Sequence, residues 1–183
     1  FDDTIIGCDT STSGADAAAY VIFGRNPKLS NWTPVLTLTA LNGDNGFKVY
    51  PLSGQGFSSW FGMTGVKCLG DYNGDLNDDF MVGDVNWNGG KGKSIMIYGE
   101  PGWASTTASS AYGIHFKHAD GSGDGVSSMI GYANTMLDLN LDGNKDIVVA
   151  EYMMDEGTGR VHVIWGTRPS SIWGDHNLPM ADE

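Results

Sequence analysis

The chain has 183 residues, is 40% apolar and carries a formal net charge of −12. This apolar content can form a hydrophobic core and excludes a disordered chain. Ten lysines and arginines scattered among 22 acidic residues form no basic stripe, which excludes a nucleic-acid-binding surface. No run of about 18 apolar residues occurs, so we expect no transmembrane segment in this chain.

Short β-rich runs recur in a fixed order along the chain. Each of three units contains a run that follows an aspartate and, later, a run that closes on an aromatic residue and a glycine. A proline follows each of these glycines, which recur at intervals of about 65–75 residues. In chain order, the expected strands are residues 3–7, 20–24 and 46–50, then 58–62, 79–83, 95–99 and 113–117, then 127–131, 146–150 and 161–166.

Units of four short strands in series are typical of β-propeller blades. We therefore expect an all-β fold of about three blades, each of four antiparallel strands, within a larger or multi-chain assembly. The expected blades are residues 1–56, incomplete at the N-terminal side, residues 57–125, and residues 126–183, incomplete at the C-terminal side. A β-sandwich is the alternative, although it does not require such a regular repeat.

Two aspartate-rich segments, the 71–79 loop and the 138–146 loop, lie directly before strands of the second and third units. Both place carboxylate or amide side chains at positions 1, 3, 5 and 9, and the backbone carbonyl of position 7 adds another oxygen. Ca²⁺ binds about six to eight oxygens, whereas Mg²⁺ prefers a rigid octahedron with several waters. The predicted calcium ligands are Asp71, Asn73, Asp75, Asn77 and Asp79 in the first loop, and Asp138, Asn140, Asp142, Asn144 and Asp146 in the second.

Neither loop matches an EF-hand. Position 12, where an EF-hand has a bidentate glutamate, is Val82 or Val149, and the following residues favour a strand. A metal-free turn rich in aspartate and asparagine is the other alternative. Gly143 at position 6 of the second loop can adopt a positive φ, but the first loop has Leu76 there. The first loop is therefore either strained at Leu76 or bent differently.

Further motifs surround the two loops: Phe61-Gly62, its weaker copy Ile130-Gly131, and Val82-Gly83-Asp84. Together with the loops, these motifs resemble the FG-GAP repeats of the integrin α-chain propeller and of many bacterial and protist surface proteins. The resemblance covers nearly the whole chain, and departs from the family at Leu76, at Leu141 and in the missing proline of the GAP element.

The resemblance implies calcium in the hairpin between the first two strands of a blade. It implies an extracellular or cell-surface location, and adhesion or recognition more often than catalysis. It also makes Asp3 the last ligand of a third loop.

The sequence contains no Gly-x-Ser-x-Gly motif, no phosphate-binding loop and no pair of histidines at the spacing of one strand face, so we expect no enzyme. We expect an extracellular calcium-binding propeller segment that recognises a protein or glycan partner. Two alternatives stay open. One is a structural protomer of an extracellular fibre or appendage that assembles through open blade edges. The other is a non-catalytic scaffold of a secreted polysaccharide- or lipid-degrading enzyme.

Three smaller features complete the sequence. Asn31 begins a glycosylation sequon, and Cys8 and Cys68 either pair or remain reduced. Among the tryptophans, Trp60 and Trp165 are expected in the core between blades, and Trp87 and Trp103, which lie in glycine-rich loops, are expected at the surface.

Overall fold

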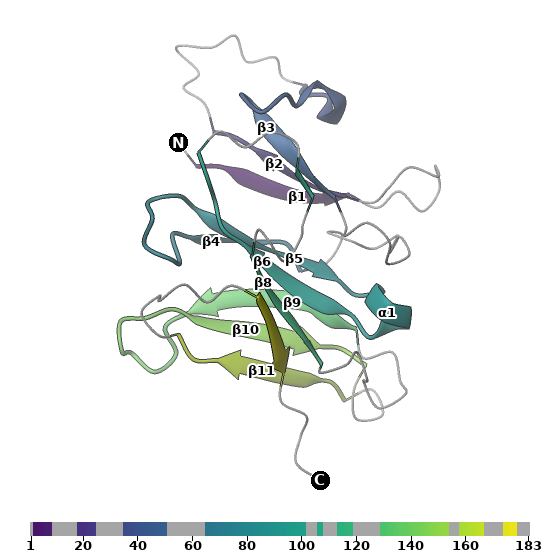
Figure 1. Cartoon of the computed structure of the whole chain (residues 1–183), viewed down its shortest axis with the longest axis vertical. Coiled ribbons are helices and arrows are strands. Elements are labelled where there is room, and N and C mark those ends of the chain that lie inside the picture. The colour runs from purple at the N-terminus through teal and green to yellow at the C-terminus, as the bar shows by residue number, and fades with distance from the viewer. Residues whose placement is uncertain are drawn as a thin grey trace.

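The computed structural model describes residues 2–8, 18–24, 35–50, 65–101, 106–107, 113–118, 129–153, 158–166 and 174–178. Within these residues the prediction of an all-β fold is confirmed, because three sheets are stacked on one another (Figure 1). Helix is confined there to α1 (Trp87–Gly90) and a 3-10 turn (Leu38–Ala40). No helix in the described part of the chain has the length and apolar character needed to cross a membrane.

Each sheet is built mainly from one stretch of the chain. In spatial order, the first sheet contains β1 (Thr4–Cys8), β2 (Ala18–Ile22), β3 (Gly46–Tyr50) and β7 (Thr106–Thr107). The middle sheet contains β4 (Lys67–Gly70), β5 (Asp79–Asp84), β6 (Lys93–Ile97), β8 (Gly113–His118) and β12 (Gly174–Leu178). The third contains β9 (Ile130–Leu137), β10 (Asp146–Glu151) and β11 (Arg160–Ile164). Neighbouring strands are antiparallel except for two parallel pairs, β3–β7 and β8–β12.

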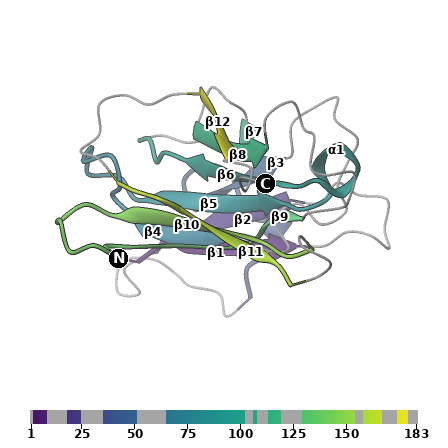
Figure 2. The ribbon, with the colours of Figure 1, turned by 90° about the horizontal axis from the view of Figure 1, so that it is seen from below.

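The middle sheet lies between the other two and is buried on both faces. Figure 2, seen from below, shows the strands of the third sheet lying over β5 and β2. Phe80 and Val82 of β5 pack toward the first sheet, and Met81 between them packs toward the third. Since successive side chains of a strand alternate between faces, a doubly covered strand buries every side chain, as β5 and β6 do; their apolar residues are consecutive, and the buried polar residues lie at the strand ends. Each such apolar side chain contributes roughly 1.5–3 kcal/mol by its burial.

Two crossing strands, β7 and β12, connect neighbouring sheets, and the sequence did not predict them. After β6 the chain adds β7 to the edge of the first sheet, beside β3, and then returns to the middle sheet as β8. After β11 it adds β12 to the edge of the middle sheet, beside β8. One strand of each later unit therefore extends the sheet of the preceding unit. The boundaries of the three units stay a prediction.

Within the described residues, two tryptophans differ from expectation. Trp165 is 58% exposed, because it lies just after β11 on the outward side of the third sheet, which no other described sheet covers. Trp87 is buried within α1, with the Nζ of Lys93 at 5.0 Å from its ring centre. Cys8 and Cys68 are both free of disulfides. The other predictions on single residues, at Asn31, Trp60, Phe61 and Trp103, lie outside the described residues.

Candidate metal-binding loops

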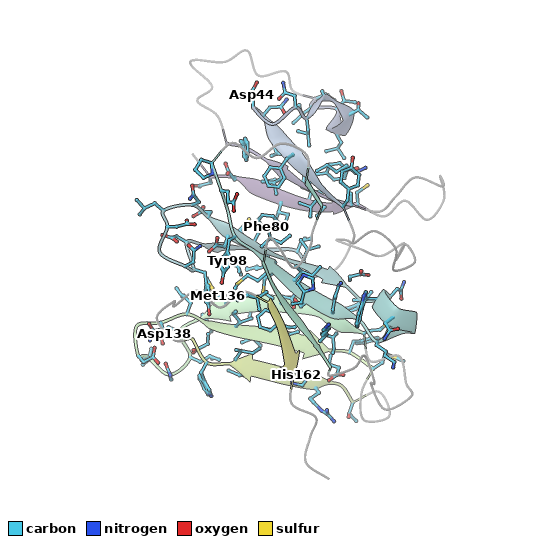
Figure 3. The ribbon with its side chains drawn as sticks, viewed as in Figure 1. Asp44, Phe80, Tyr98, Met136, Asp138 and His162 are labelled. Carbon is cyan, nitrogen blue, oxygen red and sulfur yellow. The ribbon has the colours of Figure 1, made fainter. Side chains whose placement is uncertain are left out.

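The two aspartate loops occupy equivalent places in adjacent sheets. The 71–79 loop connects β4 to β5, and the 138–146 loop connects β9 to β10. Both project from the same side of the stack, opposite α1 (Figure 1), and Figure 3 shows Asp138 within the second of them. The sequence therefore placed both loops correctly between two antiparallel strands.

The aspartate at position 1 of each loop holds the turn together. Its carboxylate accepts hydrogen bonds from backbone N–H groups at positions 5 and 6, a geometry that closes the loop around one side chain. In the 71–79 loop, Asp71 accepts from Gly74 (2.7 Å), Asp75 (3.0 Å) and Leu76 (3.0 Å). In the 138–146 loop, Asp138 accepts from Asp142 (3.1 Å) and Gly143 (3.0 Å).

Positions 3, 5 and 7 converge around the aspartate at position 5. Asn73 Nδ2 lies 2.9 Å from Asp75 Oδ2, and the N–H of Asn77 donates to Asp75 Oδ1 at 2.8 Å. Burial alone would raise the pKa of Asp75, but hydrogen bonds from these two asparagines outweigh it and lower the pKa. The second loop repeats these contacts, since Asn140 Nδ2 lies 2.8 Å from Asp142 Oδ2 and the N–H of Asn144 donates to Asp142 Oδ1 at 2.8 Å. The pKa of Asp142 is also lowered, mainly by the hydrogen bond from the Asn144 N–H.

The aspartate at position 9 ties the loop to the end of the neighbouring strand. Asp79 is only 1% exposed; its Oδ2 accepts from Tyr72 N at 2.7 Å, and its Oδ1 accepts from Gly99 N at 2.8 Å. Equivalent aspartate–glycine bonds occur in all three units, because Asp146 Oδ1 accepts from Gly166 N at 2.8 Å and Asp3 Oδ1 accepts from Gly24 N at 2.8 Å. These bonds join the two recurring features of the sequence, the aspartate and the aromatic-glycine pair.

The glycine of this bond is required by space. A Cβ on Gly99 would clash with the backbone carbonyl oxygen of Asp78, at position 8 of its loop. A Cβ on Gly166 would clash in the same way with the carbonyl oxygen of Lys145. The repeated glycine therefore lets the loop backbone approach the neighbouring strand closely, as well as donating its N–H group.

The two loops share left-handed backbone at positions 4 and 6, although their glycines differ in place. Position 4 is Gly74 (φ 81°) in the first loop and Leu141 (φ 61°) in the second. Position 6 is Leu76 (φ 73°) in the first and Gly143 (φ 87°) in the second. Of the two outcomes expected for Leu76, strain is the one found, and Leu141 has the same strain, which the sequence did not predict. A left-handed leucine costs roughly 1–2 kcal/mol.

Burial raises the pKa of Asp79 to about 6, even though hydrogen bonds from Gly99, Tyr72 and Asn73 oppose the shift. Both carboxylate oxygens of Asp79 accept hydrogen bonds from backbone N–H groups, Oδ2 from Tyr72 and Asn73 of the loop and Oδ1 from Gly99. In keeping with this, no three His, Cys, Asp or Glu side chains of the described residues form a group arranged to hold a metal.

The donor set of positions 1, 3 and 5 nevertheless suits a calcium ion. Oxygens that share one Ca²⁺ at about 2.3–2.6 Å lie roughly 3 Å apart. The contacts of 2.9 Å between Asn73 and Asp75, and of 2.8 Å between Asn140 and Asp142, have this spacing. Rotation of an asparagine amide exchanges its nitrogen and its oxygen, so the same contact can present two oxygens to a cation.

Away from the loops, a buried hydrogen-bonding contact between a histidine and a glutamate lies on the third sheet. His162 Nε2 is 2.9 Å from Glu151 Oε2, and both side chains are buried on the face toward the middle sheet. The sequence left His162 open between core and surface. The sequence did contain a signal for a recurring place in the repeat, because Asp84 and Glu151 are acidic residues at the same position of successive units. They end β5 and β10, and both are buried.

Comparison with models of known protein families returned no match, and comparison with curated protein sequences also returned none.

Proposed function

We propose that the 71–79 and 138–146 loops each bind one Ca²⁺, and that the chain is part of an extracellular β-propeller that recognises a protein or glycan. The observation that carries the calcium assignment is the shared geometry of the two loops. They have equivalent hydrogen-bond networks and the same left-handed positions although the glycine and leucine are exchanged. What the loops have in common is their alternate oxygen-bearing side chains, which suit a hard cation.

The packing of the aromatic residue before each repeated glycine supports the propeller part of the proposal. Phe23 packs between the first and middle sheets, and Tyr98 packs between the middle and third sheets, near Met136 (Figure 3). Trp165 is the third member of this series and is exposed, together with Val161 and Val163 of β11. In a propeller, a further four-stranded blade would cover this face just as the third sheet covers the middle one.

In this proposal the bound ions stabilise the hairpins, and the recognition surface is formed by loops at the ends of the strands. Calcium is abundant outside cells, which is why an extracellular location belongs to the same proposal. No enzymatic role is proposed.

Calorimetric titration of the chelated protein with Ca²⁺ tests the assignment. We expect two ions per chain, and one ion after Asp138→Asn, with Asp44→Asn as a control on an exposed aspartate outside the loops. Melting should rise with Ca²⁺ by mass action, about 2.7 kcal/mol of stability per site at 100 times Kd, and should respond little to Mg²⁺. Unchanged melting after chelation, combined with no heat of binding, would refute the calcium assignment.

A second candidate function is a protomer of an extracellular fibre. The observation that favours it is the edge of β11, beside which no further strand lies among the described residues, next to the exposed Val161, Val163 and Trp165. Open strand edges with an apolar face pair readily with another chain. Concentration-dependent assembly in sedimentation experiments, abolished by Val163→Lys on the outward face, would support this function over the first.

A further inference from the structure

A cavity of about 420 Å³ opens between the first and middle sheets. It lies at the end of these sheets that carries the 71–79 loop, and the loop residues from Leu76 to Asp79 form one of its walls. The cavity shares Asn77 and Asp79 with the predicted calcium loop, but Asp71, Asn73 and Asp75, whose spacing suits the ion, do not line it. Its volume falls within the range of small-ligand sites.

The floor of the cavity is apolar. It is formed by side chains from both sheets, and Figure 3 shows Phe80 at the boundary between them. Such a floor favours a ligand with an apolar body, because apolar surface leaves water on binding. The floor residues are Ile5, Val21, Phe23, Phe47 and Phe80.

The rest of the lining is strongly acidic. Among the described residues, four acidic side chains line the cavity, those of Asp3, Asp78, Asp79 and Glu100, and no described lysine, arginine or histidine does. Asp3 and Asp79 already accept backbone hydrogen bonds, whereas Asp78 and Glu100 are exposed at the margin. The carboxylates repel an anionic ligand, and a bare metal ion would leave the apolar floor unused.

We propose that this cavity binds an organic ammonium or guanidinium group carried on an apolar body. The apolar body would cover the floor, and the cation would lie at the margin between Asp78 and Glu100. A free amine and the lysine or arginine side chain of a peptide share this chemistry. The inference does not depend on calcium binding by either loop.

Cys68 offers a reporter inside the site. Cys68 lines the cavity. Burial raises the pKa of its thiol, and the charges of Asp78 and Asp3 raise the pKa further. A backbone hydrogen bond with Ile5 and the charge of Lys67 oppose this rise. Cys8 likewise forms no disulfide, and it is not among the described residues that line the cavity. A bound ligand should therefore slow chemical labelling of Cys68 and leave Cys8 as an internal reference.

The experiment measures labelling by a methanethiosulfonate reagent, with peptide mapping by mass spectrometry to follow each cysteine separately. Phenethylamine should protect Cys68 with a Kd of about 1 mM, a reasonable affinity for so small a ligand. The neutral analogue 2-phenylethanol should bind about ten-fold more weakly, and phenylacetate should not protect. Asp78→Asn and Glu100→Gln should each weaken phenethylamine about three-fold, and Asp44→Asn, which removes one charge far from Phe80 (Figure 3), should have no effect.

Each outcome decides the proposal. Equal protection by the amine and the alcohol, or no protection of Cys68 by any cation, would overturn it, as would equal effects of Asp44→Asn and Asp78→Asn. A blocked tripeptide with a central lysine or arginine distinguishes the sources: tighter binding than phenethylamine indicates a protein side chain, and weaker binding indicates a free amine. Melting of each variant checks that the protein remains folded.

Discussion

The 71–79 and 138–146 loops reach the same backbone path with glycine and leucine in exchanged positions. Each loop has one leucine in the left-handed region, at a cost of roughly 1–2 kcal/mol. Each also has several hydrogen bonds to its position-1 and position-5 aspartates, worth about 0.5–1.5 kcal/mol apiece. The comparison teaches that the aspartate side chains, and not the placement of glycine, determine the path of the loop.

The largest effect should follow from removing the aspartate at position 9. Asp79→Ala leaves the N–H groups of Gly99 and Tyr72 without their acceptor, and Asp146→Ala does the same to Gly166 and Leu139. We expect each change to lower the free energy of unfolding by about 2–5 kcal/mol, measured by chemical denaturation. Asp44→Ala should change it by less than about 0.5 kcal/mol. A loss for only one of the pair would break the equivalence of the two loops.

The glycine on the other side of this bond should come next. Gly99→Ala and Gly166→Ala place a methyl group against the loop carbonyl at position 8, and such overpacking costs about 1–3 kcal/mol. Thermal melting in the presence and absence of calcium gives the size of the effect. An unchanged melting temperature for Gly166→Ala would mean that the 138–146 loop moves aside more easily than its counterpart.

A smaller, pH-dependent effect should distinguish Asp79. Its pKa is about 6 in the folded protein, against about 3.8 when unfolded, so between these values the folded state holds a proton that the unfolded chain has released. Its contribution to stability is therefore full below about 3.8 and is lost as the pH rises through about 6. In chelator, the stability of the wild type relative to Asp79→Asn should fall between pH 5 and 7.5. A rise over that interval would contradict the pKa direction, and Asp146→Asn shows whether the loops titrate alike.

The smallest effect concerns the leucines. Leu76→Gly and Leu141→Gly relieve left-handed strain but add freedom to the unfolded chain, so each should stabilise the protein by no more than about 1 kcal/mol. The reverse changes, Gly74→Leu and Gly143→Leu, should destabilise by about 1–2 kcal/mol. Urea denaturation of the four variants sharpens the comparison, since unequal losses for Gly74→Leu and Gly143→Leu would show that the left-handed positions 4 and 6 differ in the strain that they impose.

Much of this architecture could be predicted from the sequence, because it depends on local pattern. Alternate aspartates and asparagines predicted both loops, and the recurring aromatic-glycine pairs predicted where β2, β6 and β11 end. Position in the repeat also linked Asp79 with Asp146, although not with the glycines that they bind.

Features that depend on contacts between units could not be predicted. Of the crossing strands, β7 (Thr106–Thr107) is only two residues long and β12 (Gly174–Leu178) contains Gly, Asp and Asn, which are rare in strands; both pair with the edge of a neighbouring sheet. Trp87 is buried although its loop is rich in glycine, since α1 folds back onto the sheet near Lys93. The acidic cavity exists only once two sheets are placed side by side.

The doubly covered middle sheet raises the question of how β5 and β6 find their correct alignment during folding. Phe80 pairs with Ile97 and Met81 with Met96, but a slip of one residue would still bury apolar side chains on both faces. Hydrophobicity alone therefore distinguishes poorly between correct and slipped pairings. A slip moves Gly99 by about 3.3 Å along the strand and so breaks its bond to Asp79, which favours the correct pairing of β5 and β6 over a slipped one.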